Sequence, residues 1–400
     1  MTVTRSGDRA QVDSATPSQP VARHPPASRF YHNPGILVLG GGVPELMFGQ
    51  AAGSGRWWPD PAVEPLQTDI HWIHNLDPVA VHLGPLAIRW YGLAYLAAFA
   101  AVYLGMLFFA RIGTSRLPKE KVSDFVTFGA LFGVLLGGRL GYALFYDPGL
   151  LLAFTRQFPY WEFLALNHGG MASHGGVLGL FFFTLWFSLR HKIPWANLGD
   201  HLVIGSTIGL FVGRLANFVN GELYGRAAPA LAWAMKFPQE LIPNPGHPGL
   251  GLPDPVRAAA ERAALRADPT LAQIQDETFH TQVIDRMRDN DTLRETVGRF
   301  LTPRHPSQLY EALLEGFALF AILFVVRMRF RRMADGVLTG LFFVLYAVFR
   351  IAVEQFREPD AAMVGPLTKG QFYSAFMILI GIAFLVWSAR HPHPDRAPAP

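Results

Sequence analysis

Seven long apolar stretches dominate the sequence from residue 86 onward. Most are close to the length of about 20 residues that an α-helix needs to cross roughly 30 Å of hydrocarbon. They cover residues 86–110, 125–145, 175–189, 198–218, 309–326, 337–356 and 372–388. The third is the shortest, and it needs His174 or the glycine-rich turn before it to complete a span. The pattern predicts an all-α integral membrane protein with seven transmembrane helices.

The overall composition fits a chain surrounded by lipid. Half of the 400 residues are hydrophobic and 16% are charged, against about 25% charged residues in a typical soluble domain. The net charge of +4 could suit nucleic acid, but the Lys and Arg residues lie between the apolar stretches, so we expect a lipid bilayer and no nucleic acid as partner. The absence of cysteine excludes disulfide frameworks, cysteine-ligated zinc, iron–sulfur clusters and a protein thiol nucleophile.

Charge in the short loops predicts the orientation of the chain. Short cytoplasmic loops carry an excess of Lys and Arg. The loops after the first, third and fifth stretches are strongly positive, whereas those after the second and sixth are nearly balanced. We therefore expect the N-terminus outside and the C-terminus inside.

The remaining segments complete the expected domain organisation. Residues 1–75 are rich in Pro, Gly, Ala and Ser without a sustained period, which predicts a disordered N-terminal tail. Residues 76–222 would hold helices one to four, and residues 305–390 helices five to seven. The segment 223–304 carries charges of both signs, and alternation of the spans makes it a small external head domain. Residues 391–400 are expected to be a cytoplasmic tail.

Ionisable residues inside the apolar stretches need a structural or functional explanation, because inserting each charged side chain into a membrane costs at least about 2.5 to 3.5 kcal/mol. With alternating helices, the polar residues of six stretches fall at one depth, in the outer third of the bilayer. They are Arg89 and Tyr91, Arg139, His174, Arg214 with Asn217 and Asn220, Tyr310 with Glu311, and Arg350 with Glu354. Such a chamber suits an anionic phosphate group whose acyl chains stay in lipid, because a guanidinium binds two oxygens at once. Asp200 is the exception, and we expect it to cap the fourth helix on the cytoplasmic side.

Each of these residues also has a simpler structural interpretation. Arg139 could pair with an acid that fixes packing, and His174 could be a satisfied residue at a helix start. Arg350 and Glu354 share one helix face and could neutralise each other. Tyr91 could be an interfacial aromatic anchor. Independent structural uses have no reason to share one depth, so the coincidence favours a functional site.

Six short motifs follow one another along the chain. The most specific is GRLANFVNGELYGR at residues 213–226. The others are RWYGL at 89–93, LGGRLGY at 136–142, GGMASHGG at 169–176, HPSQLYE at 305–311, and the run from Tyr346 through Arg350 to Glu354. In this order they resemble the bacterial phosphatidylglycerol:prolipoprotein diacylglyceryl transferase family over residues 76–388. Ala216, where the family commonly has a second Gly, and Ala172-Ser173, in place of Ser-Phe, depart from it.

The resemblance implies an enzyme that carries out the first step of lipoprotein maturation. A diacylglyceryl group would pass from phosphatidylglycerol to the thiol of the lipobox cysteine in the signal peptide of a prolipoprotein, with release of glycerol phosphate. The enzyme would lie in the bacterial inner membrane with its active site toward the outer face. The implied catalytic residues are Tyr91, His174, Arg214, Arg350 and Glu354, and the implied substrate-binding residues are Arg139, Asn217, Glu222, Gly225 and Tyr346.

The chemistry assigns hypothetical roles to these side chains. Forming a thioether by displacement needs a thiolate, and His174 is the expected base because its ordinary pKa of about 6.5 leaves it largely neutral at pH 7. Arg214 and Arg350 would bind the phosphate and stabilise its growing charge, with Arg139 as a further candidate. Glu354 would orient Arg350. We expect no cofactor and no metal, since the chamber lacks a His, Asp and Glu set at ligand spacing.

Three other classes of protein remain as alternatives. A transporter or channel would also carry buried charges, but the sequence shows no internal repeat and its charges gather on one side. A retinal-type or signalling receptor is disfavoured because the seventh stretch holds no lysine for a Schiff base. A scaffold that binds phosphatidylglycerol without consuming it stays open.

Overall fold

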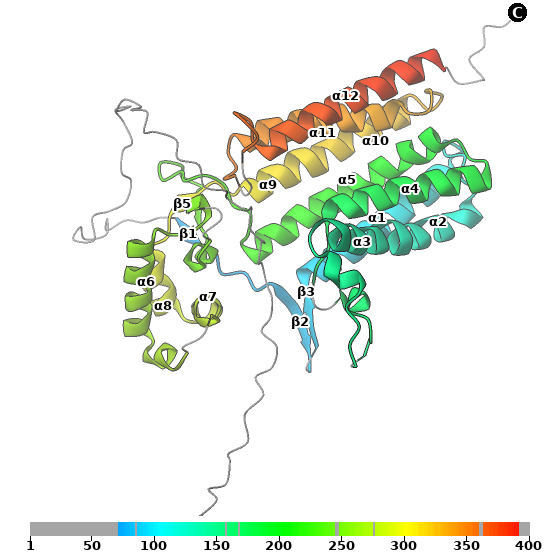
Figure 1. Cartoon of the computed structure of the whole chain (residues 1–400). Helices are drawn as coiled ribbons and strands as arrows, with labels where there is room; N and C mark the ends of the chain where they lie inside the picture. Colours follow the sequence, from blue (N-terminus) through cyan, green and yellow to red (C-terminus); the bar gives the residue numbers. More distant parts are fainter. Residues whose placement is uncertain are drawn as a thin grey trace, which may run out of the picture. The chain divides into compact units, whose positions relative to one another are not determined.

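A computed structural model describes residues 71–391, apart from residues 85, 157, 167–168, 245–247, 275–276 and 360–362. Almost all of the predicted N-terminal tail and of the C-terminal tail lies outside the described residues. The described chain is mostly helical, and six of its helices are long and apolar enough to cross a membrane (Figure 1). The protein is therefore an all-α integral membrane protein with several transmembrane helices.

The six candidate spans correspond to six of the predicted stretches. Two of them contain a π-helical turn, which separates α2 from α3 and α9 from α10. The spans are α1 (Trp90–Arg111), α2–η2–α3 (Val122–Phe128, Gly129–Leu135 and Leu136–Phe145), α5 (Trp195–Asn220), α9–η9–α10 (Ser307–Glu311, Ala312–Ala318 and Leu319–Arg329), α11 (Val337–Glu354) and α12 (Lys369–Arg390). Short 3-10 helices lie in the connections at Lys119–Lys121, Pro148–Leu151, Glu162–Leu164, Pro238–Leu241, Pro248–Leu250 and Pro269–Gln273.

The third predicted stretch forms a helix, α4 (Ser173–His191), that is not among the six. Its ends are polar, with Ser173 and His174 at one end and Arg190 and His191 at the other. These ends lower its mean hydropathy relative to the other spans. The count of seven transmembrane helices therefore stays a prediction.

The predicted start of the first span, at residue 86, is wrong. Residues Leu86–Arg89 form strand β3, which pairs antiparallel with β2 (Val79–Leu83). Gly84 adopts a left-handed conformation with φ of 59° in the turn between the two strands, a conformation that glycine adopts at little cost. The helix begins only at Trp90, whose N–H donates to the carbonyl of Pro78 at 3.1 Å. Apolar composition alone could not separate this short hairpin from the helix that follows it.

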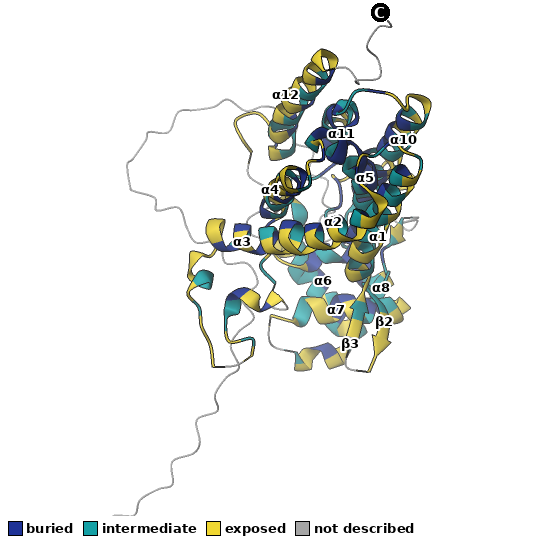
Figure 2. Cartoon of the chain, turned by 90° about the vertical axis from the view of Figure 1, so that its right-hand side faces the viewer, coloured by how far each residue is buried: buried dark blue, intermediate teal, exposed yellow. Residues whose placement is uncertain are grey.

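Helix α5 lies among the other spans and packs against α1, α4, η9, α10 and α11, while α12 packs along α11 (Figure 1). Helices α3 and α4 approach closely at glycines: a Cβ on Gly141 would lie 2.5 Å from the Cα of Gly175. Small residues allow such contact between membrane helices. Large apolar side chains such as Leu96, Phe182 and Leu379 are exposed, as expected where helices face lipid. Figure 2 shows many exposed residues along these helices.

Asp200 does not cap its own helix as predicted. One carboxylate oxygen accepts from the backbone N–H and the hydroxyl of Thr339, each at 2.8 Å, and the other accepts from the N–H of Gly336 at 2.8 Å. Asp200 therefore caps the start of α11 and joins it to α5.

The segment between α5 and α9 builds a small core of its own. It contains α6 (Asp254–Ala267), α7 (Phe279–Asp289) and α8 (Asp291–Gly298). These helices enclose buried apolar side chains that include Leu271, Met287, Leu293 and Val297. A three-stranded sheet in the order β1 (Trp72–Ile73), β4 (Met235–Lys236) and β5 (Pro303–Arg304) joins this segment to the chain before α1.

Candidate functional site

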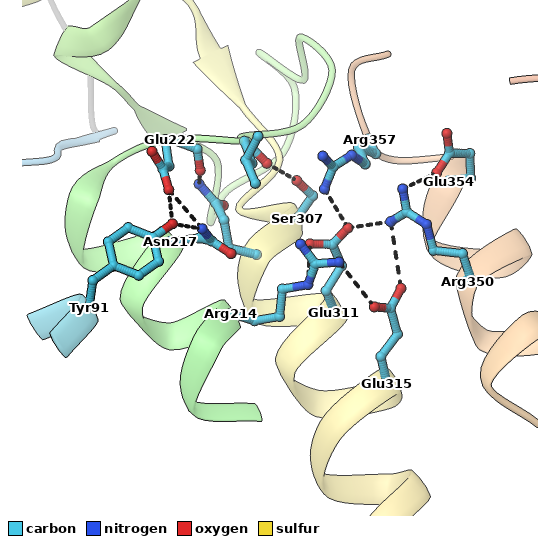
Figure 3. A network of polar contacts seen from close by, with 12 residues as sticks. Tyr91, Arg214, Asn217, Glu222, Ser307, Glu311, Glu315, Arg350, Glu354 and Arg357 are labelled. Carbon is cyan, nitrogen blue, oxygen red and sulfur yellow. Dashed lines mark hydrogen bonds and ion pairs between the residues drawn. The ribbon is translucent and has the colours of Figure 1, made fainter. Parts of the chain in front are cut away.

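Charged side chains from α5, α9, η9 and α11 meet in one buried cluster (Figure 3). Its members are Arg214, Glu311, Glu315, Arg350 and Glu354, joined by Arg357 just beyond α11. Below, these six residues are called the arginine–glutamate cluster. Glu311 is its centre: it is fully buried and receives Arg350 Nη1 at 2.6 Å, Arg357 Nη1 at 2.7 Å and Arg214 Nε at 3.2 Å.

Glu315 lies one turn further along and makes longer contacts. Its carboxylate lies 3.3 Å from Arg214 Nη2 and 3.6 Å from Arg350 Nη1. The π-helical turn η9 carries this residue, and π-turns often occur at functional sites. Gly316 allows the turn to approach α5, because a Cβ there would lie 2.6 Å from the Cα of Phe211. The close approach brings the carboxylate within reach of Arg214.

The charges in the cluster balance, with three arginines against three glutamates. Arg350 Nη2 completes the set with an ion pair to Glu354 at 2.9 Å. Buried charges need such partners, since an uncompensated charge in a low-dielectric interior is strongly destabilising. Arg214 and Arg350 keep the largest exposed side-chain fractions in the cluster, 19% and 13%, so an incoming ligand would meet these two residues first.

A second network lies beside Arg214 and joins Tyr91, Asn217 and Glu222 (Figure 3). The Tyr91 hydroxyl donates to Glu222 Oε1. The Asn217 amide donates to the Tyr91 oxygen, and to Glu222 Oε1 at 2.7 Å. Gly221 ends α5 in a left-handed conformation with φ of 68°, a common helix end, and the reversal turns Glu222 back toward Asn217. Three predicted residues are thus brought together.

Gly225 sits where two segments cross too closely for a side chain. Its N–H donates to the carbonyl of His305 at 2.9 Å, and a Cβ would lie 2.3 Å from the carbonyl oxygen of Phe356. The crossing ties the chain after α5 to the chain after α11. It therefore connects the segment that carries Glu222 with the segment that carries Arg357.

A buried ion pair between Arg304 and Glu240, in the segment between α5 and α9, contacts the crossing at Gly225. Arg304 Nε pairs with Glu240, while the Arg304 Nη1 donates to the carbonyl of Gly225 at 3.2 Å. The guanidinium also lies 5.1 Å from the centre of the Tyr224 ring. Burial raises the pKa of Glu240, and the charge of Arg304 opposes that rise. This side of the site is fixed by charge as well as by packing.

Tyr346, predicted to bind substrate, lies on α11 one turn before Arg350. Its ring stacks on Phe342 with centroids 5.8 Å apart. It interacts electrostatically with Glu315, Arg214 and Arg350. Tyr346 therefore borders the arginine–glutamate cluster.

His174 reaches the cluster only indirectly. It is exposed at the start of α4, and its ring centroid lies 5.7 Å from that of Tyr373 on α12. One turn earlier on α12, Gly370 packs so closely that a Cβ would lie 2.8 Å from Glu354 Oε2. Within the described residues, no hydrogen bond or ion pair joins His174 to the cluster; the first turn of α12 lies between them.

Arg139 makes a different set of contacts from the other predicted arginines. It is 3% exposed, and its guanidinium donates five hydrogen bonds to backbone carbonyls. The acceptors are the carbonyls of Glu162, Phe163, Ala165, Gly169 and Gly170. Because a guanidinium has five N–H groups, these bonds use all of its donors. The structure does not bring Arg139 into the arginine–glutamate cluster.

Sequence reasoning omitted three residues of the cluster from the candidate site. The sequence pattern groups Glu311 with Arg214 and Arg350 but indicates no role for it. Glu315 lies inside the predicted stretch 309–326, where any carboxylate is unusual, so the signal was present. Arg357 follows α11 in a loop and gave no such signal. Among the described residues, no group of three or more His, Cys, Asp or Glu could hold a metal ion.

Comparisons with known proteins show the family of the chain. The family model described as prolipoprotein diacylglyceryl transferase matches residues 78–387. Relatives named phosphatidylglycerol--prolipoprotein diacylglyceryl transferase include one from Bdellovibrio bacteriovorus, 37% identical over 335 residues, which cover 79% of this chain and 94% of the relative. Another, from Rhodospirillum centenum, is 39% identical over 330 residues, which cover 81% of this chain and 95% of the relative. The chain therefore belongs to the prolipoprotein diacylglyceryl transferase family.

Proposed function

We propose that this protein transfers the diacylglyceryl group of phosphatidylglycerol to the lipobox cysteine of prolipoproteins and releases glycerol phosphate. Membership of the family supports the reaction. The observation that carries its assignment to this site is the meeting of Arg214 and Arg350, from two helices, around the carboxylate of Glu311. Two convergent guanidinium groups in a region of low dielectric are suited to a phosphate ester.

The reaction is a displacement at the carbon of the diacylglycerol unit that carries the phosphate, so the headgroup leaves as glycerol phosphate. The cysteine sulfur bonds to that carbon, the carbon–oxygen bond breaks, and its electron pair stays on the phosphate oxygen. Arg214 and Arg350 bind the phosphate and stabilise the charge that grows on it. Such electrostatic stabilisation is usually the largest single contribution to catalysis. Glu354, 2.9 Å from Arg350 Nη2, holds this arginine in place.

His174 is the base in this proposal. It takes the thiol proton, because an ordinary cysteine pKa of about 8.5 leaves little thiolate at neutral pH. Its exposed position at the start of α4, next to Tyr373, gives an incoming peptide access to it. The separation from the arginines suits a base that acts on the thiol rather than on the phosphate.

The other predicted residues position the substrates. Tyr91, Asn217 and Glu222 form one network that offers donors and acceptors to the glycerol headgroup. Gly225 fixes the chain crossing beside it, and Tyr346 borders the phosphate site. Arg139 stabilises the segment that leads into α4 and does not bind phosphate, because its N–H groups already donate to backbone carbonyls of that segment.

We further propose seven transmembrane helices, with α4 as the third and the site at the outer face of the inner membrane. Helices α1, α4 and α10 end in basic residues, namely Arg111, Arg190 with His191, and Arg327 with Arg329. The positive-inside rule puts these ends in the cytoplasm. The site, at the other end of the same spans, then faces outward together with α6–α8.

The direct test is incubation of the purified protein with phosphatidylglycerol and a lipobox peptide that contains one cysteine. We expect a diacylglyceryl mass gain on the peptide and an equal amount of released glycerol phosphate. A matched peptide with Ser in place of Cys should gain no mass. Lipid binding by a folded protein without any mass gain would refute the transferase and favour the scaffold.

A further inference from the structure

The two carboxylates on the α9–η9 turn are held with unequal strength. Glu311 has one oxygen within 2.7 Å of two arginine nitrogens, Arg350 Nη1 and Arg357 Nη1. Glu315 approaches its arginines only to 3.3 and 3.6 Å. Both are fully buried, and each has one oxygen that accepts no hydrogen bond from any described residue, Glu311 Oε2 and Glu315 Oε1, so the difference lies in the distances to the arginines. Glu315 is therefore the carboxylate that a competing anion displaces more easily.

The charge balance favours such a displacement. The arginine–glutamate cluster is already neutral, so a bound phosphodiester adds one uncompensated negative charge. The released phosphate monoester carries about 1.5 to 2 negative charges at pH 7. Without an opposing charge, Arg214 and Arg350 would hold the product more tightly than the lipid.

We propose that Glu315 is an exchangeable counter-ion for the phosphate group. It occupies the donors of Arg214 and Arg350 in the free enzyme, gives way when the lipid phosphate binds, and returns as glycerol phosphate leaves. Glu311 has the opposite role, as the fixed anchor that keeps the three arginines together. This inference rests on the proposed function, because it assigns the phosphate of that substrate and product to these two arginines.

A purely structural use of Glu315 makes a different prediction. If its carboxylate only neutralises buried arginines, its removal destabilises the protein without strengthening anion binding. If it competes with phosphate, its removal strengthens anion binding, because a like charge beside a bound anion is unfavourable. The sign of the change in affinity separates the two.

The experiment measures glycerol phosphate binding to the detergent-solubilised protein by calorimetry, with thermal unfolding as a check of folding. We expect Glu315→Gln to bind glycerol phosphate at least about tenfold more tightly than the wild type. Its kcat should fall through slow product release while its KM for phosphatidylglycerol falls as well. Glu311→Gln should lose binding, and Glu261→Gln on α6, which removes a surface partner of His280, should match the wild type.

Unchanged or weaker binding by a folded Glu315→Gln variant would overturn the proposal. If that variant does not fold, Glu315→Asp retracts the carboxylate by one methylene from both arginines, and we expect tighter binding by about threefold or more. No tightening in a folded Glu315→Asp variant would equally overturn it. Absence of transfer by the wild type refutes the proposed function instead, so the two failures are distinguishable.

Discussion

Replacing Gly225 by alanine should inactivate the protein while leaving most of its stability. The new Cβ would lie 2.3 Å from the Phe356 carbonyl oxygen and within 2.8 Å of the Cβ and the carbonyl oxygen of His305. Two of these three neighbours are backbone oxygens, so no flexible side chain can move aside. The two segments must separate, and the hydrogen bond from Gly225 N–H to His305, now 2.9 Å long, must lengthen.

The magnitude follows from this geometry. Overpacking by one methyl group in a well-packed interior costs about 1 to 3 kcal/mol, and loss of one hydrogen bond adds about 1 kcal/mol. The protein should therefore stay folded, with a melting temperature lowered by several degrees. Activity should fall further, by about 100-fold or more, since a misplacement of about 1 Å has effects of that size on catalysis. The displaced segment carries Glu222 and so disturbs its contact with Tyr91.

The assay is diacylglyceryl transfer to a lipobox peptide, measured beside thermal unfolding of the same preparation. Gly105→Ala is the matched control, because no atom lies within 4 Å of a Cβ at that position on α1. That variant should keep wild-type activity and stability. Wild-type transfer by Gly225→Ala would refute the reasoning, as it would mean that the crossing can open without moving the site.

Three further predictions concern single ionisable residues. Arg214→Lys keeps the charge but loses the fork that reaches Glu311 and Glu315, so kcat/KM should fall about 100- to 1,000-fold; full activity would exclude bidentate phosphate binding. Glu240→Gln leaves the buried Arg304 with only the more distant carboxylate of Glu358, at 3.6 Å, and should lower the free energy of unfolding by about 1 to 3 kcal/mol, which denaturant titration would measure; an unchanged free energy of unfolding would contradict this. Burial lowers the pKa of His74 from 6.5 to about 4, with a smaller effect of Arg288 in the same direction. The unfolded chain therefore binds the proton first, and the stability that neutral His74 contributes is complete above pH 6.5 and decreases by up to about 3 kcal/mol as the pH falls toward 4. His74→Gln should show a smaller loss of thermal stability between pH 7 and pH 5 than the wild type, and an equal loss would show that other groups dominate.

The transmembrane helices could be predicted from the sequence because hydrocarbon thickness fixes both their length and their composition. Six candidate spans confirm this for six of the predicted stretches. The first boundary failed because three of the four residues of β3, Leu86, Ala87 and Ile88, are apolar like those of α1, and hydropathy does not distinguish a paired strand from a helical turn. The partner of Asp200 could not be predicted either, because its acceptor role toward Gly336 and Thr339 depends on how α11 packs against α5.

Depth alone predicted part of the candidate site. It selected Arg214, Arg350 and Glu354, which do meet, but it gave Arg139 the same weight. The acceptors of Arg139 are backbone carbonyls between residues 162 and 170. Because every residue type has a backbone carbonyl, the sequence does not indicate which residues accept these hydrogen bonds. The predicted depth in the membrane likewise does not reveal that the first turn of α12 separates His174 from the arginines. Residues at one depth contact each other only if their helices are rotated so that the side chains face each other.

The balanced charge of the cluster links stability to function. Three arginines without partners would be too costly to bury among apolar helices, so glutamates must accompany them in the free protein. In the site as proposed, the same glutamates compete with a phosphate that approaches Arg214 and Arg350, and they limit how tightly the headgroup alone can bind. Much of the affinity for a lipid must therefore come from its acyl chains, which contact the apolar helices. After displacement the acyl chains stay with the peptide, and the soluble phosphate product loses that part of the binding energy. If Arg214 and Arg350 bind the phosphate as proposed, selective release of glycerol phosphate follows from a site that is neutral before the substrate enters.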